Sequence, residues 1–169
     1  MMAMTGRFPI APMSPLMRVL TIVVLLLPVL FLTAACTSPQ TSLVMAPVSA
    51  LLVALYLLVY TWSRPRAYRI DHDRLVLEFP LRTLSVPRKD ILDAVVMEKE
   101  DLKRNLGFAV RVGAGGLFGV FGWLWTSKRG WVEVHSSRED CMVIVERREG
   151  LALLVSPEDC AGFVRALTD

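Results

Sequence analysis

The sequence predicts a helical hairpin that crosses a membrane twice and carries one mainly β domain, with strands arranged as antiparallel sheets and closed by a C-terminal helix. Three observations support this α-hairpin plus α+β fold class. Two long apolar runs lie near the N-terminus, short strands with alternating apolar residues follow, and one amphipathic helix ends the chain. A chain of 169 residues has room for one domain beyond such a hairpin.

The predicted hairpin rests on two runs without a charged residue, 19–36 and 43–62, separated by the short polar loop 37–42. A bilayer core about 30 Å thick requires roughly 20 apolar residues in helical form. A soluble helix is rarely apolar on every face over such a length. We therefore predict transmembrane helices over 19–36 and 43–62, a flexible cytoplasmic tail over 1–18 and a domain over 63–169.

Charge placement predicts the orientation of the hairpin. All 16 acidic residues follow Ile70, whereas five of the 19 basic residues precede it and flank the two runs. These five are Arg7, Arg18, Arg64, Arg66 and Arg69. Because basic residues near membrane spans stay on the cytoplasmic side, both ends of the hairpin and the domain are expected in the cytoplasm, at the inner (plasma) membrane. The pI of about 9.0 therefore comes from the membrane flanks, which excludes a basic nucleic-acid-binding stripe on the domain.

The three cysteines are odd in number and widely spaced, which predicts neither a disulfide framework nor a zinc site and fits a reducing compartment. Cys36 has two interpretations. Residues 32–36 resemble a lipoprotein cleavage box, but Thr33 stands where such boxes usually have Leu, and the segment before it is long. Whether or not Cys36 carries a lipid, the second run returns the chain to the same side.

Strand character begins after the second run, where apolar residues alternate over 75–79. A charged connection with a helical turn is expected over 98–105. The last three strands are separated by short turns, which predicts an antiparallel meander. The further strands are predicted over 81–86, 91–97, 108–112, 131–136, 141–147 and 151–155.

The glycine-rich segment 113–125 has three interpretations. A third membrane span is one, but the uncharged stretch 112–127 is short and contains five glycines. A nucleotide-binding G-x-G-x-x-G loop would need glycine at the position of Phe118, and a P-loop would need a following G-K-[ST]. Strands with tight bends, which glycine permits, are the interpretation that we adopt.

The C-terminal segment carries the signals of a helix start. Ser156 is a suitable N-cap and Pro157 suits the first helical position. An apolar stripe follows at helical spacing, which predicts a helix that caps the sheets. Its members are Cys160, Phe163, Val164 and Leu167.

Several of these stretches together resemble the bacterial pleckstrin-homology-like (PH-like) domain family over roughly 63–167. The matching stretches are 68–71 with 75–77, 86–87 with 90–91, 111–113 with Gly119 and Trp123, and 154–159 with Phe163 and Leu167. The resemblance implies a roll of two bent antiparallel sheets closed by the C-terminal helix. It also implies a non-enzymatic role, commonly in membrane-anchored chains that self-associate.

Residues for catalysis or metal binding are sparse. The two histidines, His72 and His135, have no accompanying ligand cluster, so no metal site is expected. Cys141 or Ser136 near His135 is a conceivable nucleophile, but Cys141 and Cys160 fall in apolar patterns typical of core residues. We expect no enzyme activity, catalytic centre, cofactor or nucleic-acid partner.

Two candidate interaction surfaces remain. Arg64, Arg66 and Arg69 lie where anionic headgroups would be, either as topology anchors or as lipid contacts. The aromatic cluster of Phe118, Phe121, Trp123 and Trp125 belongs to the domain core, to a protein interface or to a membrane-dipping loop.

These features lead to a functional hypothesis. We expect a membrane-anchored scaffold that recruits an unidentified protein partner or forms a homo-oligomer, through the domain or through the small-residue stripe Ala46, Ala50 and Ala54. The alternative is a regulator that senses anionic membrane lipids or envelope stress through its juxtamembrane arginines.

Overall fold

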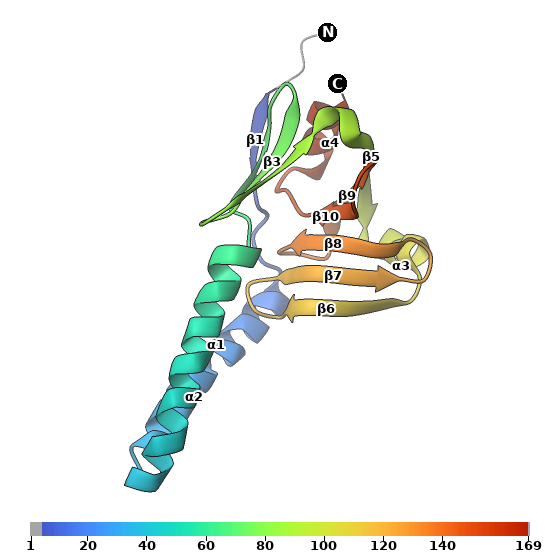
Figure 1. Cartoon of the computed structure of the whole chain (residues 1–169). Helices are drawn as coiled ribbons and strands as arrows, with labels where there is room; N and C mark the ends of the chain where they lie inside the picture. The colour runs from blue at the N-terminus through green and yellow to red at the C-terminus, as the bar shows by residue number, and fades with distance from the viewer. Residues whose placement is uncertain (1–4, 169) are drawn as a thin grey trace.

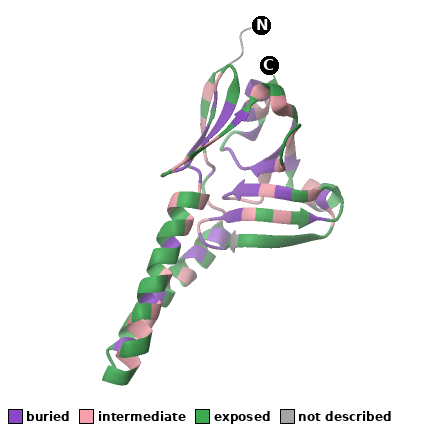
Figure 2. Cartoon of the chain, viewed as in Figure 1, coloured by how far each residue is buried: buried purple, intermediate pink, exposed green. Residues whose placement is uncertain are grey.

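A helical hairpin projects from a two-sheet domain in the computed structural model of the chain (Figure 1). The structure describes residues 5–168, apart from the side chains of Lys103 and Ala114. Helix α1 spans Pro15–Ala35, and α2 spans Pro39–Leu58 and continues as a π-helical turn, η1, over Val59–Ser63. Both are long and apolar enough to cross a membrane, and most of their length is exposed (Figure 2), as the sequence predicts.

Polar side chains join the two helices inside the hairpin. Ser49 donates a hydrogen bond to the carbonyl oxygen of Pro28 over 2.9 Å, and the Tyr56 hydroxyl donates to that of Val24 over 3.0 Å. Such bonds satisfy hydroxyl groups that have no water partner in a bilayer. Ala50 and Ala54 of the predicted small-residue stripe are exposed and take no part in this contact between the helices.

The first sheet begins within the predicted N-terminal tail. Its antiparallel strands are β1 (Gly6–Pro9), β2 (Ala67–Ile70), β3 (Arg74–Glu78) and β4 (Thr83–Pro87), in that spatial order. The expectation of a flexible tail is therefore wrong for 6–9. The physical reason is that β1 pairs along β2, from Gly6 opposite Ile70 to Pro9 opposite Ala67, and Phe8 packs its ring against Phe163.

The second sheet has the spatial order β5-β9-β10-β8-β7-β6. Its strands are β5 (Ile91–Glu98), β6 (Ala109–Gly115), β7 (Val120–Thr126), β8 (Gly130–Ser136), β9 (Cys141–Arg147) and β10 (Ala152–Val155). The predicted meander is wrong for the last three, because β10 lies between β8 and β9 and runs parallel to β8. Leu153 and Leu154 point to opposite faces and are both buried, which suits a central strand.

Two short helices connect the strands. A 3₁₀ turn, η2 (Arg88–Asp90), leads from the first sheet into β5, and α3 (Lys99–Leu106) leads from β5 to β6. The helical turn expected over 98–105 is therefore present as α3. The glycine-rich segment forms the β6–β7 hairpin, as predicted. Gly113 faces Gly122 there, so closely that a Cβ on either would come within 2.9 Å of the other's Cα.

The last helix, α4 (Cys160–Thr168), closes the space between the sheets (Figure 1). It begins four residues after the predicted N-cap, Ser156, because Asp159 accepts the hydrogen bond from the Gly162 backbone N–H over 2.8 Å. Phe163 is fully buried among residues of both sheets, which confirms the expected capping role of this helix. A second apolar cluster lies between α3 and the larger sheet and includes Met17 at the start of α1.

Candidate functional site

The domain is held against the helical hairpin by the turn between β6 and β7. The Thr21 hydroxyl in α1 donates to the carbonyl oxygen of Gly116 over 3.0 Å and accepts from the Phe118 N–H over 2.9 Å. Phe118 has a backbone φ of 62° and packs its ring on Tyr60 of η1, 5.2 Å between centroids. This turn therefore lies beside the residues at which both long helices meet the domain.

Of the three predicted headgroup arginines, only two remain available for an anion. Arg64 and Arg66 line a cleft of about 300 Å³ whose other walls are Ile10, Tyr60, Pro65 and Pro80. The Arg64 guanidinium lies 5.8 Å from the centre of the Tyr60 ring. Arg69 instead forms ion pairs with Asp71 at 3.3 Å and Glu78 at 3.4 Å. The cleft lining contains no acidic residue among the described residues, which makes it a suitable anion site.

Arg82 also belongs to this end of the domain, and the sequence analysis missed it. Its guanidinium stacks on Trp62 at 5.2 Å and on Phe79 at 4.5 Å, and its Nε donates to the Trp62 carbonyl oxygen over 3.0 Å. No local sequence signal identifies Arg82, because the bend between β3 and β4 returns the chain toward η1 only in the folded sheet.

The four residues of the predicted aromatic cluster lie in three different environments. Phe118 packs on Tyr60, and Phe121 is 1% exposed and belongs to the interior. Trp123 and Trp125 are 52% and 39% exposed on the outer face of β7. Of the four, only these two are exposed, and Phe118 is half-buried.

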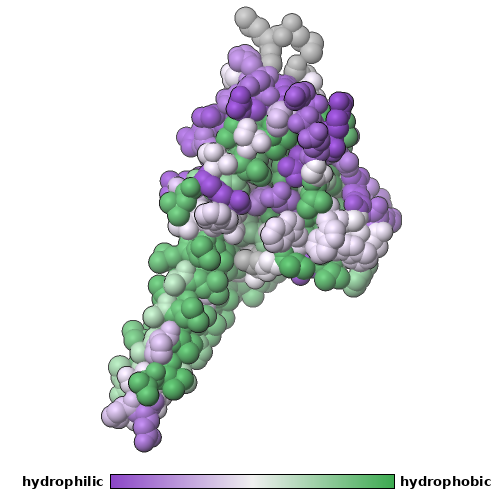
Figure 3. Space-filling model, viewed as in Figure 1, coloured by the Kyte–Doolittle hydropathy of each residue, from purple (hydrophilic) through white to green (hydrophobic). Residues whose placement is uncertain are grey.

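Neighbouring strands extend this exposed surface, which we name the tryptophan face. Trp125 lies opposite Trp131 of β8 on one side and Val110 of β6 on the other, and Val112 lies opposite Trp123. All five side chains are exposed. Figure 3 shows pale and green side chains over these strands beside the top of the helix pair. Strand alternation predicts that Val110 and Val112 share this face, and Trp131 is identified only by the pairing register.

His135 is buried and belongs to a polar network that contains no nucleophilic side chain among the described residues. Its Nε2 lies 3.0 Å from Glu133 Oε1, and Arg147 lies 3.3 Å from the other carboxylate oxygen. The hydrogen bond to His135 lowers the pKa of Glu133, Arg147 adds to this effect and burial opposes it. The Ser136 hydroxyl is bonded to the carbonyl oxygen of Arg138. Among the described residues, no group of three His, Cys, Asp or Glu side chains could hold a metal ion.

Comparison with protein families decides the classification of this fold. The family model of the bacterial PH domain matches residues 66–169, more than half of the chain. The chain belongs to the bacterial PH domain family. No curated protein and no solved structure matched it. The match covers the whole tryptophan face. Of the cleft lining it covers Arg66 and Pro80, whereas Ile10, Tyr60, Arg64 and Pro65 lie outside it, as does β1.

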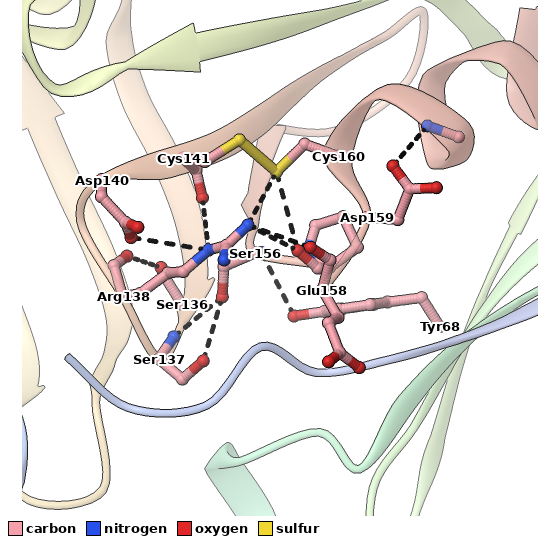
Figure 4. The surroundings of a disulfide bond; sticks show 12 residues. Tyr68, Ser136, Ser137, Arg138, Asp140, Cys141, Ser156, Glu158, Asp159 and Cys160 are labelled. Atoms are coloured by element: carbon pink, nitrogen blue, oxygen red, sulfur yellow. Dashed lines mark hydrogen bonds and ion pairs between the residues drawn. A yellow bond between two sulfur atoms is a disulfide. The ribbon is translucent and has the colours of Figure 1, made fainter.

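The PH domain contains a disulfide that the sequence analysis did not predict. Cys141 of β9 and Cys160 of α4 are joined, with their Cα atoms 6.8 Å apart (Figure 4). The prediction that the cysteines form no disulfide framework is wrong for this pair, because β9 and α4 meet only in the folded domain. The Arg138 side chain lies beside the bond and donates to the carbonyl oxygens of Cys141, Pro157 and Glu158, each over 3.2 Å.

Hydrogen bonds of the polar residues in Figure 4 connect the N-terminal segment to the region around the disulfide. Burial raises the pKa of the Tyr68 hydroxyl, which stays protonated and donates to the His135 carbonyl oxygen over 2.9 Å. Ser156, predicted as a helix cap, instead accepts a hydrogen bond from the Ser137 N–H over 2.9 Å. Its carbonyl oxygen accepts from the Ala11 N–H over 3.0 Å, so the segment before α1 is bonded into the PH domain.

Proposed function

We propose that this chain is a non-catalytic interaction module, anchored in the membrane by α1 and α2, that docks a protein partner or a second copy on its tryptophan face. The exposure of Trp123, Trp125 and Trp131 on one face carries this proposal. Aromatic side chains dominate the binding energy of protein interfaces, and exposed clusters of them are uncommon on monomeric proteins.

The free edge of β6 strengthens this proposal. β6 is the terminal strand of the larger sheet, so the backbone groups on its outer side have no strand partner among the described residues. Such an edge can pair with a strand of another chain. Val110 and Val112 on β6 belong to the tryptophan face, so a partner strand on this edge would extend the same apolar surface.

The proposed membrane topology places both ends of the hairpin in the cytoplasm. Strand β1 pairs with β2, which supports an even number of crossings between them. Arg64 and Arg66 follow the second helix, whereas the loop between the helices is uncharged, and this asymmetry favours cytoplasmic flanks. The PH domain would then stand at the inner face of the membrane.

Site-specific crosslinking in cells tests the docking function. A photoreactive phenylalanine derivative is placed at Trp125, and at exposed Leu92 on β5 as a matched control. We expect position 125 to crosslink either the chain itself or one distinct protein, and position 92 to crosslink neither. The first product would define a self-assembling scaffold and the second an adaptor. No product at position 125, or equal products at both positions, would contradict the proposal.

The cleft between Arg64 and Arg66 supports a second candidate function, recognition of anionic headgroups. Two cations line it at the end of α2, and each basic residue near a membrane surface contributes about 1 kcal/mol to the attraction of anionic lipid. The full chain would be extracted into lipid nanodiscs and its associated lipids quantified. Replacing Arg64 and Arg66 by Gln is expected to reduce anionic lipid enrichment, whereas Arg69→Gln should not, because Arg69 is already paired with carboxylates. Equal enrichment in the unaltered chain, the Arg64/Arg66 double variant and the Arg69→Gln variant would reject headgroup recognition.

A further inference from the structure

A groove lies on the opposite face of the larger sheet from the tryptophan face, beneath α3. It has a volume of about 350 Å³. Leu102 and Leu106 of α3 form one wall, and Leu124, Val134 and Leu154 from three different strands form the floor. Small-molecule sites have this size and this apolar lining, with a few polar groups that fix the ligand's orientation.

The polar groups at the rim of the groove favour a negatively charged end on the occupant. Lys99 and Arg111 line the rim, and neither forms an ion pair with a carboxylate among the described residues. Arg138 also lines it, but its guanidinium is bonded to backbone carbonyl oxygens. Among the described lining residues, Glu139 is the one that is acidic. At the edge of the apolar groove, the two cations without a carboxylate partner thus outnumber the one carboxylate.

The groove lies beside an apolar cluster that includes the start of the first membrane helix. Met13 and Met17 pack in the same apolar cluster as Leu102 and Leu124. The Arg111 guanidinium lies over Gly115, where a Cβ would come within 2.6 Å of its Nη1. The next residue along the chain, Gly116, accepts the hydrogen bond from Thr21. With α1 in the bilayer, the cation of Arg111 therefore stands beside the membrane surface.

We propose that this groove binds a long-chain fatty acid taken from the adjacent bilayer. The acyl chain lies between α3 and the sheet, and the carboxylate lies at the rim near Arg111 and Lys99. The volume accommodates a single chain, which excludes a complete two-chain phospholipid. This site uses neither the tryptophan face nor the Arg64–Arg66 cleft, so it stands apart from the function proposed above.

Photolabelling of the full chain in phosphatidylcholine nanodiscs tests the proposal. The probe is palmitic acid with a diazirine in its chain, and labelled peptides are identified by mass spectrometry. A bilayer-resident probe labels the 19–62 helices in any case. We expect additional labelling of 102–124 and of 134–154, which lie outside the hairpin and form the groove.

Two pairs of variants locate the site. Leu124→Trp fills the groove and should abolish labelling of the domain, while Leu92→Trp, at an exposed position on β5, should not. Arg111→Gln should reduce domain labelling about two- to fivefold, as expected for an ion pair at an exposed rim, whereas Arg148→Gln, exposed elsewhere, should leave it unchanged. If Leu124→Trp fails to fold, as judged by circular dichroism, the exposed Arg111 substitution decides the test.

Three outcomes would overturn the proposal. Labelling confined to the helices would show that the groove takes no acyl chain. Equal labelling by the corresponding uncharged diazirine alcohol would show that the rim does not select an anion. Domain labelling by a phosphatidylcholine that carries the same diazirine chain would identify a phospholipid as the occupant.

Discussion

Phe163 shows at the scale of one residue how the PH domain is closed. Its side chain is fully buried and contacts two other aromatic rings edge-on, Phe8 at 5.5 Å and Tyr68 at 5.9 Å. These rings come from β1 and β2, so one side chain joins the C-terminal helix to both sides of the membrane hairpin. Its burial follows from the helical spacing in the sequence, whereas its contact with Phe8 does not.

Replacing Phe163 by Ala should lower the free energy of unfolding by about 3–5 kcal/mol, because a large buried side chain is lost and a cavity remains. Urea titration of the protein in detergent, followed by tryptophan fluorescence, measures this change. Arg165→Ala on the exposed side of α4 is the matched control and should change the stability little. An unaltered midpoint for Phe163→Ala would contradict the capping role of α4.

Glu133 couples the stability of the domain to pH. Its pKa in the folded protein is below the ordinary value of 4.5, chiefly because of the hydrogen bond to His135. The unfolded chain therefore takes up the proton first as pH falls. The stabilising contribution is present above 4.5 and is lost as pH falls through the lowered folded-state pKa.

Glu133→Gln removes this titration and should reduce stability at about pH 6 by roughly 0.5–1 kcal/mol, a size limited by the partial exposure of the carboxylate. The difference between the two proteins should shrink as pH falls below 4.5 and through the lowered folded-state pKa. Thermal melting of both proteins across this range measures it. Curves that stay parallel down to the lowest pH would mean that Glu133 has no lowered pKa.

Among the structural elements, those with a regular local pattern were predicted correctly. The two apolar runs, the alternating strands and the apolar stripe of α4 can each be recognised from residues that are close together in the sequence. Strand β1 and the central placement of β10 were not predicted, because neither depends on its own residues alone. β1 needs β2, which lies beyond the whole hairpin, and β10 needs a gap between β8 and β9.

The residues of the two candidate surfaces were likewise predicted only where local sequence was sufficient. Trp123 and Trp125 were selected by composition, but Trp131 joins them only through the pairing of β7 with β8. Arg69 looked equivalent to Arg64 and Arg66, yet strand alternation and the nearby Glu78 remove it from the anion cleft. The types of residue on the two candidate surfaces were therefore predictable. Which of these side chains are exposed and free of an ion pair depended on contacts between segments that are distant in the sequence.

The disulfide makes a prediction at the scale of elements, because it joins α4 to β9. In the purified, oxidised protein, a reductant should lower the free energy of unfolding by about 2–4 kcal/mol, as expected when a loop of this size is released. Melting with and without a phosphine reductant measures the effect. The Cys141→Ser/Cys160→Ser double variant should not respond, and an equal response in both proteins would show that the reductant acts elsewhere.

The topology of the whole molecule brings two physical arguments into opposition. Arginines on both flanks of an uncharged hairpin favour a cytoplasmic domain. Disulfides, in contrast, persist in oxidising compartments outside the cytoplasm. Charge acts while the hairpin inserts, before the domain folds and Cys141 can meet Cys160, so we expect it to decide the orientation.

The oxidation state of Cys141 and Cys160 in cells then indicates the compartment in which the PH domain lies. If the domain faces the cytoplasm, Cys141 and Cys160 are kept as thiols in growing cells and form the disulfide only after lysis or oxidative stress. Cys160 is buried in the folded domain, so cells are quenched with acid and denatured in the presence of a maleimide without reductant, which should modify both positions. A tag after Asp169 should resist protease added to intact cells. A tag cleaved from outside, together with a disulfide that excludes the maleimide, would place the PH domain on the outer face and invert the proposed topology. Because β1 is paired with β2, the N-terminal segment would have to lie outside as well, so a second tag near the N-terminus checks either result independently.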